Sequence, residues 1–212
     1  MTAPTRDTLP NTIPINALSR RRFFQAVGLF TASLCMAPMA GAAVLAGVDV
    51  PDTLRIDGHT LVLNGIGLRT LTFLKVRIYV AGLYLPKKTS NAQAILASPG
   101  PKVIALHHIH SGSKSQVQDR YREGEKVNCG SGGCDASLQA DFERLVASAE
   151  PVNDGDLTLY VVTDTSFRVV FNGREVIAFK GSRLGNMIIE GFIGARPPSE
   201  EVRAGLLGVP AG

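Results

Sequence analysis

The residues best suited to chemistry lie in one long apolar stretch, from Leu61 to Leu85. This stretch is rich in β-branched and aromatic residues, which is typical of β-strands. Within it, Arg69 follows a Gly-x-Gly step (Gly65, Gly67), and Tyr79 lies in the next apolar run. A guanidinium in such a strand must meet an anionic or strongly polar group, because burying it unpaired is costly. That group is either a carboxylate of the protein or a ligand, and Tyr79 is either a second ligand-binding group or a core aromatic with a satisfied hydroxyl.

The rest of the chain predicts strands and helices in separate blocks. Strands are expected at 54–56, 61–63, through the stretch up to 85, and at 102–109, 157–162, 167–171 and 175–179. Helices are expected at 91–97, 114–126, after Asp135, at 183–192 and after Ser199. Asp57-Gly58 and Asn172-Gly173 are typical hairpin turns. Because the blocks do not alternate as β-α-β units, we predict an α+β fold, a large antiparallel sheet with helices on one face.

The first 42 residues resemble an export signal of the twin-arginine type. Arg20 and Arg21 precede an apolar stretch of small residues, and Ala40-Gly41-Ala42 fits an A-x-A cleavage site. We therefore expect a signal peptide over 1–42, a mature domain over 43–212 and a periplasmic location. The alternative of an uncleaved anchor is less favoured, since the apolar run is shorter than the ~20 residues of a membrane span and Pro38 interrupts it.

Charge and composition limit the class of partner. The chain of 212 residues has a net charge of +4, but four arginines against one aspartate in residues 1–42 supply +3 of it. The expected mature domain is close to neutral and has no basic stripe, so a nucleic acid partner is not expected. No stable membrane anchor is expected after cleavage, and the sequence predicts no oligomeric state.

Two groups of residues invite a metal or redox interpretation. Cys129 and Cys134 enclose a Gly-rich loop, and an even pair in an oxidising compartment predicts a structural disulfide. A redox pair would lack the C-x-x-C spacing, and two cysteines fall short of a zinc site. His108 and His110 would share one face of a strand while His107 points away. With no acidic motif nearby we expect an exposed or sheet-edge histidine cluster, with no metal and no cofactor.

Several segments, in order, are similar to the chalcone isomerase-like family. They are Gly65–Thr70, Lys75–Pro86, Ile95–Leu96, Gly100–Lys102, Asn172–Val176, Ile188–Gly194 and Leu206–Gly208. Together the resemblance covers roughly residues 48–208. It implies an open-faced sandwich of a large sheet and a helical layer, with a ligand cleft between the two layers.

The resemblance also implies candidate catalytic residues. Chalcone isomerase chemistry adds a phenolate to an enone and polarises the ketone, which calls for a cation and hydroxyl donors. The arginine that follows the Gly-x-Gly step in catalytic members matches Arg69. A threonine there falls at Tyr79, and a serine or threonine of the late helix falls at Asn186.

The tyrosine and asparagine that catalytic members carry on a helix have two possible positions. One alignment places Gly124 at the asparagine, which removes that side chain. The other uses Tyr121 and Asn128 but places Gly124 where the family has a lysine.

An arginine paired with a tyrosine resembles the family's non-catalytic, fatty-acid-binding branch. A guanidinium offers a fork of donors to a carboxylate, and a phenol adds one more. We therefore expect a small amphipathic carboxylate, fatty-acid-like or aromatic, bound by Arg69, Tyr79, Asn186 and Tyr121. A genuine isomerase acting on a flavonoid-like enone, and a structural or chaperone-like periplasmic module, are the alternatives.

Overall fold

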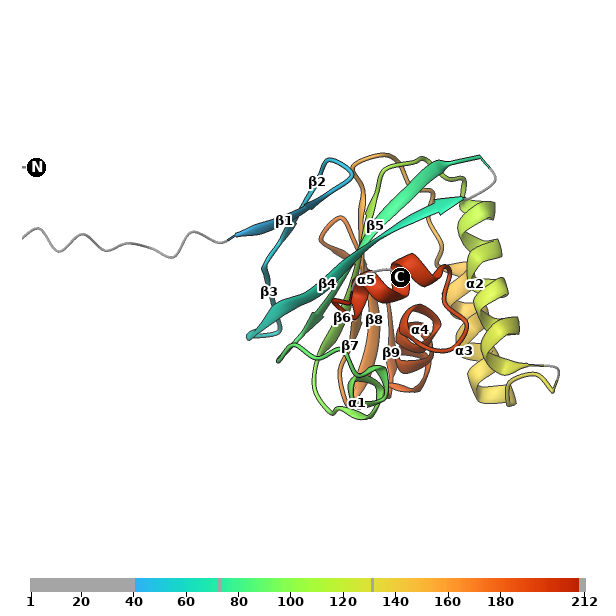
Figure 1. The fold of residues 1–212 in the computed structure, drawn as a ribbon. Coiled ribbons are helices and arrows are strands. Elements are labelled where there is room, and N and C mark those ends of the chain that lie inside the picture. The colour runs from blue at the N-terminus through green and yellow to red at the C-terminus, as the bar shows by residue number, and fades with distance from the viewer. Residues whose placement is uncertain (1–40, 72–73, 131, 210–212) are drawn as a thin grey trace, which may run out of the picture. The chain divides into compact units, whose positions relative to one another are not determined.

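The computed structural model describes residues 41–71, 74–130 and 132–209, and its main feature is a seven-stranded antiparallel sheet (Figure 1). Each strand pairs with the next in the chain, and the sheet is curled into a half-barrel. The strands are β3 (Thr53–Ile56), β4 (His59–Leu71), β5 (Val76–Leu85), β6 (Lys102–His108), β7 (Leu157–Val162), β8 (Ser166–Phe171) and β9 (Arg174–Lys180). The predicted antiparallel sheet is confirmed, and the stretch 61–85 is a pair of strands.

Helices pack against one face of this sheet. They are α1 (Ala92–Ala97), α2 (Lys114–Cys129), α3 (Ala136–Ala147), α4 (Arg183–Ile193) and α5 (Glu200–Leu206). Side chains from α1, α3, α4 and α5, among them Phe142 and Ile189, form one fully buried cluster with the inward residues of β5 to β9. Helix α2 has no fully buried residue and contributes only partly buried groups to this cluster. The α+β prediction with helices on one face is therefore confirmed.

The opposite face carries a small hairpin that the sequence did not predict. Its strands are β1 (Ala42–Leu45) and β2 (Val48–Pro51), and Val50 is completely buried in a second apolar cluster on this face. The turn between them has positive φ at both residues, 54° at Ala46 and 87° at Gly47. Two positive φ values are typical of a type I′ turn, for which asparagine or aspartate is the usual first residue. An Ala-Gly pair therefore gives no clear turn signal.

The two turns that the sequence did predict have the same geometry. Asp57 and Gly58 have φ of 48° and 77°, and Asn172 and Gly173 have φ of 47° and 80°. Glycine and the short polar residues reach these angles at low steric cost. These turns fix the registers of β3 against β4 and of β8 against β9.

Two bulges decide which side chains of the β4–β5 hairpin face the helices. Leu63 pairs with Tyr84 while Gly65 pairs with Leu83, so Asn64 is an extra residue in β4. An extra residue shifts all following side chains to the opposite face, because the side-chain period of a strand is two. Past this bulge, β4 directs its Gly-x-Gly step and the following arginine towards the helices.

The predicted export signal lies outside the described residues, except for its last two positions. In the part of the chain that the structure describes, no helix is both long and apolar enough to cross a membrane.

Candidate functional site

Arg69 and Tyr79 lie directly opposite each other on neighbouring strands. They are register partners in the β4–β5 hairpin, and Tyr79 packs against the cluster between the sheet and the helices. Directly opposed residues of an antiparallel pair point to the same face. The two groups that the sequence singled out are therefore brought together on the helix-covered side, and both are partly buried.

The Gly-x-Gly step before Arg69 allows helix α5 to lie on the strand. A Cβ at Gly67 would stand only 2.7 Å from the backbone Cα and carbonyl oxygen of Val202. A Cβ at Gly65 would overlap the carbonyl of Gly205 in the same helix. The step thus serves the close approach of two backbones, and this places the first turn of α5 beside Arg69.

No carboxylate lies within ion-pair distance of the Arg69 guanidinium among the residues that the structure describes. Glu201, in the first turn of α5, is an acid whose pKa the charge of Arg69 affects. The pKa of Glu201 is lowered chiefly by a hydrogen bond from its own backbone N–H and by Ser199, and only weakly by Arg69. Within the described residues, the guanidinium of Arg69 therefore forms no ion pair.

The Tyr79 phenol remains protonated at neutral pH. Burial raises the pKa of Tyr79 to about 12, although the positive charges of Arg69 and Arg120 oppose that shift. A phenol that keeps its proton is a hydrogen-bond donor, and no acceptor for it is found in the described parts of the chain. Arg69 and Tyr79 thus present donors from adjacent strands, and this combination suits an anionic oxygen.

His108 completes the polar end of the site and was not predicted as part of it. Its ring stands edge-to-face on Tyr79, with 6.4 Å between centroids, and its Nε2 lies 3.0 Å from Thr158 Oγ1. Burial lowers the pKa of His108 to about 4, so the ring is neutral near pH 7. The expectation of an exposed or sheet-edge cluster is wrong for this residue, because β6 lies between β5 and β7 and His108 is buried.

Deeper in the helix-covered layer, two tyrosine hydroxyls bond to each other. Tyr121 of α2 and Tyr160 of β7 have their oxygens 3.1 Å apart, and burial raises the pKa of both phenols. One hydroxyl donates and the other accepts, so one O–H of the pair has no acceptor within the described residues. Sequence reasoning missed Tyr160, although the alternation in Leu157–Val162 could have placed it with Thr158 on the inner face.

Apolar rings surround this hydroxyl pair. The centroid of Tyr160 is 6.4 Å from that of Phe167 and 6.4 Å from that of Phe192, and Phe167 stacks on Phe179 at 5.5 Å. The layer between sheet and helices is therefore aromatic and apolar, with polar groups at the Arg69 end and at one interior point.

Asn186 lies away from this arrangement. It lines a pocket of about 210 Å³ together with Lys102 and Ser182, and its amide Nδ2 donates to Ser182 Oγ at 3.3 Å. Its Oδ1 is buried with no partner in the described structure. Lys102 begins β6, whereas Tyr79 pairs with His108 at its end. Lys102 and His108 are six positions apart along β6, a distance of roughly 20 Å.

The second half of α2 offers no catalytic asparagine at the site. Asn128 donates its amide to the Gly124 carbonyl at 2.9 Å, within its own helix. Gly124 has open space where a side chain would be. Of the residues weighed on α2, only Tyr121 reaches the sheet.

Cys129 and Cys134 lie at disulfide distance, with Cα atoms 4.9 Å apart. They connect the end of α2 to the loop that leads into α3, and both pack against the main core. This pair would fix the C-terminal end of α2.

Comparison with known proteins identifies the family. The model of the chalcone isomerase-like family matches residues 42–208. The chain belongs to the chalcone isomerase-like family. No curated protein matches it in a sequence search. Among solved structures, the chalcone isomerase-like domain is similar to the crystal structure of a fatty-acid binding protein of Arabidopsis thaliana (AtFAP1). The TM-score is 0.64 at 17% identity, and the match covers 78% of this chain and 95% of the plant chain.

Proposed function

We propose that this protein binds a small amphipathic carboxylate between its sheet and its helices, without catalysing a reaction. The observation that carries the proposal is the juxtaposition of Arg69 and Tyr79 on the helix-covered face. Arg69 has no ion-pair partner among the described residues, and Tyr79 keeps a free donor. A carboxylate would satisfy both at once, and charge-assisted hydrogen bonds are the strongest kind available to it.

The apolar part of the ligand would enter the aromatic layer. Tyr160, Phe167 and Phe192 belong to this layer, and each methylene moved from water into it would contribute about 0.8 kcal/mol. The structural similarity to a fatty-acid binding protein of the same fold supports this class of ligand. Tyr121 would contact the ligand through the free O–H of its pair with Tyr160.

The geometry gives less support to an isomerase. Asn186 lies in a pocket beside Lys102, at the opposite end of β6 from His108, the register partner of Tyr79. Asn128 uses its amide within α2. The donors that would polarise an enone are thus reduced to Arg69, Tyr79 and the tyrosine pair.

We also propose that the protein acts in the periplasm. Support comes from the Arg20-Arg21 pair, the apolar stretch after it and the A-x-A site in the sequence. A cysteine pair at disulfide distance agrees with an oxidising compartment.

The binding proposal is tested by titrating the purified domain with palmitate in a calorimeter. Arg69→Ala should weaken binding by about 1.5–3 kcal/mol, the contribution of hydrogen bonds to a charged group. That is roughly a 10- to 150-fold increase in Kd. Tyr79→Phe removes one neutral donor and should cost less, about 0.5–1.5 kcal/mol.

Arg55→Ala provides the matched control, because Arg55 is an exposed arginine of β3 in the same sheet. It should bind palmitate as the wild type does. Equal affinities of the Arg69 and Arg55 variants would contradict the proposal. Acceleration of chalcone cyclisation that disappears with Arg69→Ala would instead establish an isomerase, and a response to neither ligand would favour the structural module.

A further inference from the structure

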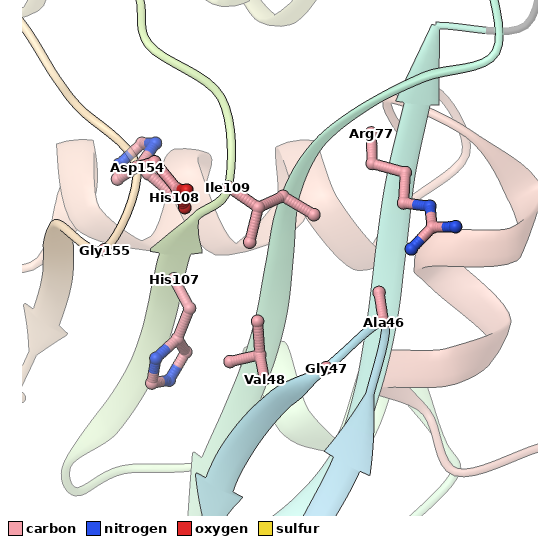
Figure 2. A pocket seen from close by; sticks show the side chains of 9 residues that line it. All are labelled: Ala46, Gly47, Val48, Arg77, His107, His108, Ile109, Asp154 and Gly155. Atoms are coloured by element: carbon pink, nitrogen blue, oxygen red, sulfur yellow. The ribbon is translucent and has the colours of Figure 1, made fainter.

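A second pocket lies on the face of the sheet that carries the β1–β2 hairpin. It has a volume of about 570 Å³ and lies between the turn of that hairpin, the start of β5, the end of β6 and the loop before β7 (Figure 2). This volume is within the range of small-molecule sites, roughly 300–1,000 Å³. The Arg69 and Tyr79 pair of the proposed carboxylate site lies on the other face of the sheet. His108, which packs against Tyr79, is also among the residues that line this pocket.

A bulge in β5 directs Arg77 into this pocket. Arg69 pairs with Tyr79 but Thr70 pairs with Arg77, so Ile78 is an extra residue. Without it, Arg77 and Tyr79 would share a face, because they are two positions apart. With it, Arg77 projects over the turn of the β1–β2 hairpin, as Figure 2 shows.

The pocket has opposite charges on its two sides. Arg77 stands on one side and Asp154 on the other, with Val48 and Ile109 between them (Figure 2). Within the described residues, neither charged group forms an ion pair, and neither donates or accepts a side-chain hydrogen bond. By contrast, the carboxylate of the neighbouring Asp156 accepts hydrogen bonds from the Asn153 backbone N–H and from the Asn172 side chain.

The groups between the charges are neutral. Val48 and Ile109 are aliphatic, and burial lowers the pKa of His107, which keeps its imidazole uncharged at pH 7. The surface between the two charged groups is therefore apolar. An apolar segment with a charge at each end matches this order of groups.

We propose that this pocket binds a zwitterion with an apolar spacer, its carboxylate on Arg77 and its ammonium on Asp154. The spacer would lie on Val48 and Ile109, next to the His107 ring. An ω-amino acid has this chemistry. The two exposed charges would contribute modestly, since ion pairs in contact with water are weak, so selectivity depends on both ends being recognised together.

The test uses ω-aminohexanoate as the probe, with hexanoate and hexylamine as ligands that each lack one charge. Binding is followed by NMR as the ligand is added to the intact domain. The shifts of the His107 imidazole signals locate the ligand, and their dependence on ligand concentration gives Kd. The zwitterion should bind at least about tenfold more tightly than either monofunctional ligand, and the His107 signals should shift. One decade in Kd corresponds to about 1.4 kcal/mol.

Variants at both ends separate this site from non-specific binding. Arg77→Ala and Asp154→Asn should each reduce the affinity for ω-aminohexanoate to that of a monofunctional ligand, while Arg55→Ala leaves it unchanged. Thermal unfolding of each variant shows that the domain is still folded. The proposal is overturned if the zwitterion has no advantage, if its affinity survives either substitution, or if the His107 signals do not move at millimolar ligand.

Discussion

Replacing Gly67 by alanine tests whether the Gly-x-Gly step exists to admit helix α5. The new Cβ would lie 2.7 Å from both the Cα and the carbonyl oxygen of Val202, and 3.1 Å from its carbonyl carbon. Non-bonded carbon atoms prefer about 3.5–4.0 Å. Since the obstructing atoms belong to the backbone, no rotamer change can relieve the overlap, and α5 must move by about 1 Å.

Overpacking of this kind costs about 1–3 kcal/mol. For a domain of this size, each kcal/mol lowers Tm by about 2–4 °C. A loss of ~2 kcal/mol in the free energy of unfolding should therefore lower Tm by roughly 4–8 °C. The measurement is urea unfolding followed by circular dichroism, with a thermal scan beside it.

Gly124→Ala is the matched control, because it is the same chemical change at a place with nothing within 4 Å of the new methyl group. Gly124 lies inside helix α2, where alanine is favoured over glycine by about 0.5–1 kcal/mol. This variant should therefore be more stable than the wild type. If Gly67→Ala is as stable as the wild type, Gly67 is not required for the close approach of α5 to β4.

Further predictions concern pH, the cysteines and export. Burial lowers the pKa of His108 from 6.5 to about 4, so between these pH values the unfolded chain binds more protons than the folded one. The free energy of unfolding should therefore fall by up to about 3 kcal/mol as the pH drops from 6.5 to 4. His108→Gln should flatten that slope, and an unchanged slope in urea titrations would show that other groups cause it. Periplasmic protein should carry a Cys129–Cys134 bond, and intact mass after alkylation without reductant should show no free thiol; two alkylated cysteines would contradict it. Replacing Arg20 and Arg21 by lysine should trap the precursor in the cytoplasm, and normal periplasmic accumulation on fractionation would exclude the twin-arginine route.

Much of the fold could be predicted because its signals are local. Period-two alternation places the strands, and Asp57-Gly58 and Asn172-Gly173 define two hairpins through the backbone angles that these residues favour. The predicted caps Asp135 and Ser199 mark the starts of α3 and α5. The family resemblance rests on segments of the same kind, and the family match over residues 42–208 agrees with it.

The hairpin of residues 42–51 was not predicted, since its turn uses Ala46 and Gly47 in place of a typical turn pair. This hairpin is held on the far face of the sheet by the burial of Val50. A contact between distant segments leaves no local pattern in the sequence.

Which residues meet at the site was decided by tertiary structure. Strict alternation would put Leu63 and Arg69 on the same face of β4, but the bulge at Asn64 puts them on opposite faces. In the same way, the bulge at Ile78 puts Arg77 and Tyr79 on opposite faces of β5. A one-residue bulge has no reliable sequence signal, because it depends on contacts made by distant segments. Asn64, for example, donates to the Leu206 carbonyl 142 positions away, at 2.7 Å.

The sequence by itself determined the residue types available for chemistry, an arginine and a tyrosine in one long stretch that favours β-structure. Only the tertiary structure joined Tyr121 to Tyr160, buried His108 beside Tyr79 and left Asn186 at the far end of the sheet. The physical reason is that side-chain spacing along a strand or helix is fixed locally. The packing of α2 and α4 on the sheet, by contrast, depends on the summed contacts of the whole apolar layer.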